Sequence, residues 1–155
     1  GAHTFLGQLA HGSADVIITP LNDSVVDLDV IARPAYESHT ELTPAVYTKM
    51  VQQYKRDAHA QRGAVPRWIV LRNRLIPNQD HIGNNLKILA EKFDFELIHG
   101  LHDNVKLREL FAQGLSVMDP LRDTSVAEIS ARQDVRQLLR ALDPVRYKGY
   151  RNAER

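Results

Sequence analysis

Three short apolar runs along the chain predict buried β-strands. They span residues 15–20, 67–73 and 95–100, and they are rich in β-branched, leucine and aromatic side chains. Each has the length of a strand and is followed by a proline, a glycine or a polar cluster, which is typical of the point where a strand ends. We therefore expect three strands, separated by long intervals.

Apolar residues at helical spacing fill most of these intervals. A short helix around Phe5 to Ala10 should stop at Gly12-Ser13, and a longer one should begin at Thr43-Pro44, a good N-cap and N1 pair. Residues 22–32 match neither period and predict a loop running into a short helix. The four longer helices are predicted over residues 43–61, 77–93, 102–114 and 123–142, the last ended by Pro144.

The alternation of strands and helices predicts an α/β fold, a parallel sheet flanked by helices. In such sheets ligands bind at the carboxyl ends of the strands. All three predicted ends are polar or carry a glycine or proline: residues 20–23, 72–74 and 99–102. The sequence therefore places the candidate site at this edge.

Asn73 is the first candidate at that edge. Its amide can donate and accept together, which matches the N7 acceptor and N6 donor of adenine. An asparagine after a strand also often caps or turns the chain, and the residue alone leaves both interpretations open.

Several basic residues lie near Asn73 in the sequence. Six Lys and Arg residues lie between Lys55 and Arg74, against one acid, Asp57. Arg72 and Arg74 could face phosphates, DNA or a partner's carboxylates. A solvated basic face is the alternative.

Carboxylates and histidines give weaker signals. Asn22-Asp23 with Asp27 and Asp29 could hold Mg²⁺ through water, could orient a nucleophile, or could cap the next helix. His99 and His102 have an H-x-x-H spacing, but no third ligand is evident nearby, so no metal site is predicted.

Composition narrows the function classes. The chain has 155 residues, 43% hydrophobic and 25% charged, with a formal net charge of +1 and no cysteine. These values suit one globular domain and exclude disulfides and thiolate chemistry. The sequence contains no G-x-x-x-x-G-K-[ST], G-x-G-x-x-G, G-x-S-x-G or H-E-x-x-H motif. No catalytic residue is predicted.

Three segments together resemble the MipZ branch of the ParA/MinD P-loop ATPases. A strand ends in T-P-x-N-D-S-x-x-D-x-D at residues 19–29, and a later one ends in V-L-R-N-R at residues 70–74. R-E-L-F at residues 108–111 is followed by Gly114-Leu115. All three occur in the family's order, and the resemblance covers about residues 1–120.

The resemblance implies roles for several residues. In the family the asparagine of R-N-R lies beside the adenine, which favours that role for Asn73. The loop on the other side of the base corresponds to Gly100, Leu101 and His102. Asn22 and Asp23 fall near the nucleotide and the dimer interface.

The resemblance also implies a cellular setting. Such ATPases use ATP and Mg²⁺, dimerise around ATP, bind DNA non-specifically and interact with a ParB-like centromere-binding protein. MipZ-type members inhibit FtsZ polymerisation, in the cytoplasm and on the nucleoid, without a membrane partner. The helix over residues 77–93 has only two lysines, so Arg72 and Arg74 become the expected DNA contacts.

The family's P-loop half has no counterpart in this sequence. The family's Walker B element ends in D-T-P-G and this chain starts at Gly1, so we expect residues 1–142 to be the C-terminal part of such an ATPase domain, followed by a basic tail at 143–155. We expect such a piece to be inactive as an ATPase, to expose apolar surface and to associate. The alternatives are a stand-alone module that binds protein or DNA, and a small α/β enzyme with its own pocket.

Overall fold

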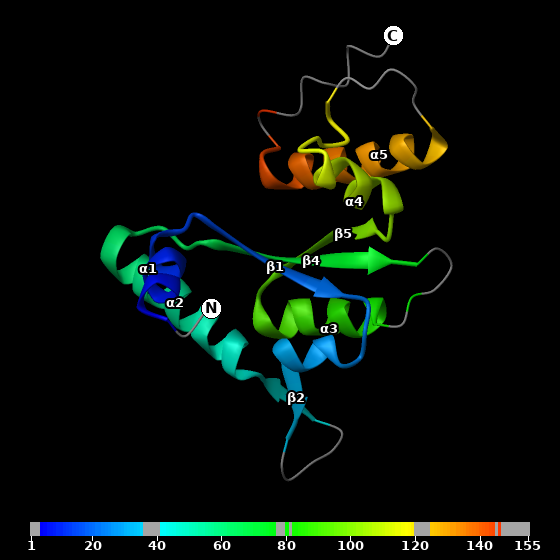
Figure 1. The fold of residues 1–155 in the computed structure, drawn as a ribbon. Coiled ribbons are helices and arrows are strands. Elements are labelled where there is room, and N and C mark those ends of the chain that lie inside the picture. Colours follow the sequence, from blue (N-terminus) through cyan, green and yellow to red (C-terminus); the bar gives the residue numbers. More distant parts are fainter. Residues whose placement is uncertain are drawn as a thin grey trace.

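A three-stranded parallel sheet forms the centre of the protein. The computed structural model describes residues 4–35, 41–76, 80, 82–119, 125–144 and 146. In the sheet, β4 (Arg67–Leu75) lies between β1 (Val16–Asn22) and β5 (Glu96–His102), as Figure 1 shows. The predicted α/β class with a parallel sheet flanked by helices is confirmed.

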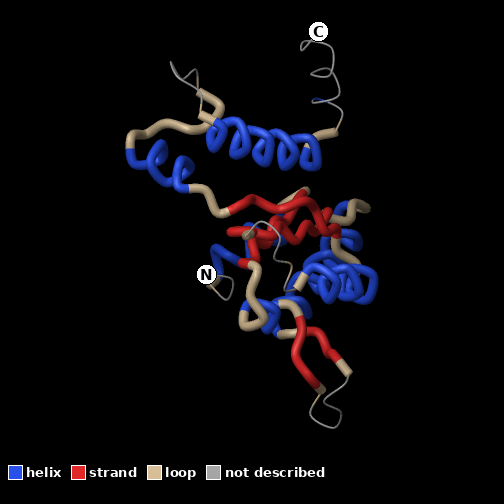
Figure 2. Tube along the Cα trace, turned by 90° about the vertical axis from the view of Figure 1, so that its right-hand side faces the viewer, coloured by secondary structure: helices blue, strands red, loops and turns tan. Residues whose placement is uncertain are grey.

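Helices cover both faces of this sheet. On one side lie α2 (Val46–Arg62) and α3 (Gly83–Phe93), with α1 (Phe5–Ser13) against α2. On the other lie α4 (Val105–Ala112) and α5 (Val126–Leu142), an arrangement visible in Figures 1 and 2. The larger core lies beneath α2 and α3, and a smaller one joins α4 to α5. The larger core includes Ile17, Val51, Trp68, Val70, Leu86, Leu89 and Phe93.

A two-stranded ribbon was missed by the sequence interpretation. Residues 27–30 form the expected short helix, η1 (Asp27–Val30), but β2 (Ala32–Pro34) then pairs antiparallel with β3 (Leu42–Pro44). Figure 2 shows the ribbon extending away from the body. Thr43 donates its hydroxyl hydrogen bond to the Arg33 carbonyl at 3.1 Å. The predicted cap at Thr43-Pro44 is therefore wrong: strand pairing holds these residues extended, and α2 begins at Val46 with Ala45 as N-cap.

All three strands run further than their apolar runs. Pairing continues to Asn22 with Asn73 and to Leu75 with His102. Ladder hydrogen bonds do not require apolar side chains, so polar residues extend the strands past the buried part. The predicted starts at 77–79 and 123–124 lie outside the described residues, as does the tail except residues 143, 144 and 146.

Part of the surface is apolar. On α1, Phe5, Leu6 and Leu9 are exposed, as is Ile18 on the edge strand β1. This agrees with the expectation of exposed apolar surface; association of the chain stays a prediction. Within the described ranges, every helix is too short or too polar to span a bilayer.

Arg67 connects the sheet to the end of α5. Its guanidinium donates to both carboxylate oxygens of Glu96, at 2.8 and 2.7 Å, and to the carbonyls of Ala141 and Leu142, at 2.9 and 3.0 Å. A cation at these carbonyls also complements the negative end of the helix. The hydrogen bonds from Arg67 lower the pKa of Glu96 below its usual range.

Acid should weaken this connection. Because the pKa of Glu96 is lower in the folded chain, ionised Glu96 contributes stability above its unfolded pKa of about 4.3, and the contribution disappears as the pH falls through the folded value. Since Glu96 is about half exposed, we expect Glu96→Gln to cost well under about 1 kcal/mol at pH 7. Urea unfolding at pH 7 and pH 3 measures the effect; a parent–variant difference that stays unchanged at pH 3 would contradict it.

Candidate functional site

Asn22 and Asn73 form an amide pair at the carboxyl edge of the sheet. They are register partners on β1 and β4, and Asn73 Nδ2 donates to Asn22 Oδ1 at 3.2 Å. Below them, the Asp23 backbone N–H donates to the Asn73 carbonyl at 3.3 Å. Parallel pairing therefore brings together two amides that are 51 residues apart in sequence, and it orients the Asn73 side chain.

A shallow pocket of about 410 Å³ opens beside this pair. It lies where β4 and β5 end and α4 begins, so backbone from three elements surrounds it. Asn73, Arg74 and His102, three of the residues predicted from sequence, share its wall with four that were not predicted. The latter are Asp103, Asn104, Leu107 and Arg108.

The segment opposite Asn73 contains a β-bulge. Leu71 pairs with Ile98 but Asn73 pairs with Leu101, so β5 uses three residues where β4 uses two. Gly100 lies in this bulge and is buried. A Cβ at this position would lie 2.5 Å from the Arg72 carbonyl oxygen. The bulge places Leu101 directly across from Asn73 and leaves Gly100 packed against β4. Of the predicted segment, His102 is the residue that lines the pocket.

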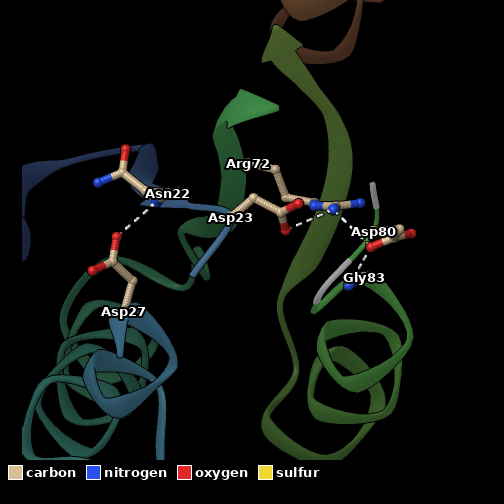
Figure 3. Close-up of polar contacts among 6 residues, drawn as sticks. All are labelled: Asn22, Asp23, Asp27, Arg72, Asp80 and Gly83. Atoms are coloured by element: carbon tan, nitrogen blue, oxygen red, sulfur yellow. Dashed lines mark hydrogen bonds and ion pairs between the residues drawn. The ribbon is translucent and has the colours of Figure 1, made fainter. Parts of the chain in front are cut away.

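Arg72 is held inside the protein by two carboxylates, as Figure 3 shows. Its Nη2 lies 2.8 Å from Asp23 Oδ1 and 2.8 Å from Asp80 Oδ1. The side chains of Arg72 and Asp23 are 14% and 4% exposed, whereas Asp80 is 54% exposed. Asp23 and Arg72 therefore form a largely buried ion pair between β1 and β4, and Asp80 connects this pair to the start of α3. The DNA contact predicted for Arg72 and the nucleotide contact predicted for Asp23 stay predictions.

Asp80 also caps the first turn of α3. Its Oδ1 accepts from the Gly83 N–H at 2.6 Å, and this hydrogen bond, with the nearby Arg72 charge, lowers the pKa of Asp80. A single carboxylate oxygen thus accepts from a free N–H of the helix and from Nη2 of Arg72.

Arg74 lies at the mouth of the pocket in a left-handed conformation, with φ of 57°. It is 62% exposed and lies 3.8 Å from Asp103, which Arg108 also contacts, at 2.6 Å. Left-handed backbone costs a non-glycine residue about 1–3 kcal/mol, and such positions concentrate at functional sites. Arg74 and Arg108 give the mouth a net positive charge.

The remaining predicted polar residues have separate positions. Asp27 accepts from the Asn22 N–H at 3.1 Å, which closes the turn after β1, and Asp29 lies on η1. His99 and His102 are both close to Asp134 of α5, 3.9 and 2.9 Å from its carboxylate. The third member of this cluster is 32 residues beyond His102, so spacing alone could not reveal it.

The fold and the polar edge define the class: an α/β protein with a parallel sheet flanked by helices, consistent with a partial P-loop NTPase-like fold. The family model for ATPase MipZ matches residues 1–145. The chain belongs to the MipZ ATPase family. A comparison with curated proteins gave no significant match.

Membership of an ATPase family indicates use of a nucleotide, usually with Mg²⁺. The edge site fits the base: an oriented amide, a pocket beside it and a cationic mouth suit a polar heterocycle. The sequence has no P-loop motif that would hold the phosphates.

Proposed function

We propose that this chain supplies the adenine-recognising side of a MipZ-type ATP site. The Asn22–Asn73 amide pair carries the proposal. An amide nitrogen has two protons, so Asn73 can give one to Asn22 and offer the other, with its carbonyl oxygen, to a base. That donor–acceptor pair matches the N7 and N6 groups of adenine.

The remaining edge residues complete the proposed base site. Leu101 lies across from Asn73, and His102 lines the pocket next to it. Gly100 allows the strands to approach, and Asn22 fixes the amide. Asp23 acts through Arg72, by holding the edge in shape.

ATP and Mg²⁺ bind the intact protein in this proposal, and ATP drives formation of a homodimer. Within the cell the protein regulates division-site placement by inhibiting FtsZ and by interacting with a ParB-like protein on the nucleoid. Its non-specific DNA contacts include Arg74, which is exposed, and Arg72, which would need to give up an internal partner. The isolated chain has no ATPase activity, since it lacks a phosphate-binding motif.

Adenosine binding tests the proposal. In a ¹⁵N–¹H spectrum of the chain, millimolar adenosine should shift the signals of Asn22, Asn73 and residues 100–102, and guanosine should not. Asn73→Leu should weaken the adenosine affinity roughly 5- to 150-fold, the about 1–3 kcal/mol of a lost bidentate base contact.

His59→Ala is the matched control, because His59 is exposed and lines a different pocket, between α2 and α3. It should leave adenosine binding unchanged. Absence of adenosine shifts, or equal shifts with Asn73→Leu, would favour the alternative, a stand-alone module that binds protein or DNA. ATP turnover by the isolated chain would contradict the prediction of inactivity.

A further inference from the structure

A cluster of two histidines and one buried aspartate lies where α5 crosses β5. His99 and His102 come from β5 and Asp134 from α5, and one ligand atom from each lies within 4.8 Å of the others. The imidazole rings are 5.6 Å apart between centroids. β5 and α5 thus bring three possible metal ligands together, and the proposed base site uses only His102 of the three.

The β-bulge explains why the two histidines face the same carboxylate. Residues i and i+3 of a regular strand point to opposite faces of a sheet. The extra residue of β5 between Ile98 and Leu101 reverses this alternation. His99 and His102 consequently both face the carboxylate of Asp134.

Asp134 is unusually placed for a carboxylate. Its side chain is only 6% exposed, yet it lies on a helix that has a solvent-exposed face. Its Oδ2 accepts from the His102 backbone N–H and contacts His102 Nδ1, both at 2.9 Å, while its Oδ1 is 3.9 Å from His99 Nε2. A buried carboxylate normally has a strong charged partner, and the described contacts here are an amide and two imidazoles.

We propose that His99, His102 and Asp134 bind a divalent transition-metal ion, with Zn²⁺ as the best fit. Two imidazole nitrogens and one carboxylate oxygen are ligands of catalytic zinc sites, which keep a fourth position for water. Tetrahedral zinc with bonds of about 2.0–2.2 Å places its ligand atoms roughly 3.3 Å apart. His102 Nδ1 and Asp134 Oδ2 are already 2.9 Å apart, so the adjustment falls on His99, whose Nε2 is 3.9 Å from Asp134 Oδ1 and whose side chain is 53% exposed.

The ligand types select the metal. Imidazole suits zinc, copper, nickel and iron, whereas magnesium prefers an octahedral shell of oxygens. The site is therefore distinct from the Mg²⁺ that accompanies ATP. Bound zinc would neutralise Asp134 and link α5 directly to β5, beside the pocket that His102 also lines.

Zinc titration of the untagged chain tests the site. Calorimetry at pH 7.5 should give one saturable Zn²⁺ per chain, and Co²⁺ in its place should give the visible absorption of a tetrahedral site. Loss of a group that merely supports a ligand weakens metal binding about 10–100-fold, so His99→Ala should weaken it at least about tenfold. Excess Mg²⁺ should not compete.

His59→Ala is again the control, since His59 lies outside the cluster. Five histidines lie outside the cluster: His3, His11, His39, His59 and His81. If one of them bound the zinc, His99→Ala would keep the affinity of the parent. We therefore expect His99→Ala to lose zinc affinity and His59→Ala to keep it. His99 is exposed, so its variant should fold, which the spectrum of Trp68 checks. Equal zinc affinity of His99→Ala and the parent, or no saturable binding, would overturn the proposal and would leave the adenosine result unaffected.

Discussion

Arg72→Met is expected to destabilise the fold by about 3–5 kcal/mol, the usual cost of leaving one partner of a buried ion pair without the other. Asp23 is 4% exposed and would lose the cation beside its Oδ1, while its Oδ2 already has no hydrogen-bond partner among the described residues. Native domains are stable by about 5–15 kcal/mol in total. The variant should therefore be close to unfolding at room temperature.

Two control variants separate the buried pair from the exposed one. Asp80→Asn removes the carboxylate that is 54% exposed, and it should cost no more than about 1 kcal/mol. A double variant, Asp23→Leu with Arg72→Met, removes both buried charges and should recover much of the stability, because apolar residues often replace a buried pair at little cost. Urea unfolding followed by the fluorescence of Trp68, the one tryptophan of the chain, measures all three. An equal loss of unfolding free energy in Arg72→Met and Asp80→Asn would contradict the claim that burial of the Asp23–Arg72 pair causes the large effect.

Gly100→Ala is the second variant with a large expected effect. The added Cβ would lie 2.5 Å from the Arg72 carbonyl oxygen and 2.7 Å from Arg72 Cβ. These atoms belong to β4 and cannot rotate away, so the strands must separate at the bulge. Overpacking of this kind costs about 1–3 kcal/mol, and sometimes more. Because the same residues align Leu101 with Asn73, the variant should also lose adenosine-induced shifts.

Gly12→Ala is the matched control for that substitution. A Cβ at Gly12, in α1, would meet nothing within 4 Å. Alanine favours a helix over glycine by up to about 1 kcal/mol, so this variant should be as stable as the parent or slightly more so. Thermal unfolding compares the two, and a Gly100→Ala melting temperature equal to that of Gly12→Ala would contradict the close approach seen at the bulge.

Sequence patterns were sufficient for the class of fold and for the sheet edge at which the candidate residues gather. Short apolar runs separated by helical periodicity predicted the parallel sheet, since a strand buried on both faces must be apolar throughout. Polar residues at the ends of those runs predicted the position of Asn73, Asn22 and His102. The family itself was identifiable from three short motifs.

The ribbon of β2 and β3 was harder to predict than the sheet. Residues 32–34 and 42–44 are too short to show a period, and their pairing depends on each other more than on local preference. For the same reason a sound N-cap sequence at Thr43-Pro44 did not start a helix.

What the amino-acid sequence determined by itself is which segments are buried and which residue types follow them, because hydrophobic periodicity is a local property. Tertiary structure alone decided which distant polar groups meet. The charge of Arg72 leaves phosphates, DNA and a partner's carboxylates open, and only the approach of β1 and α3 gives it Asp23 and Asp80 as partners. Near His99 and His102 in the sequence there is no third ligand, and only the packing of α5 against β5 brings Asp134 close to them. Such contacts depend on strand register and on how helices pack, and no single segment determines either.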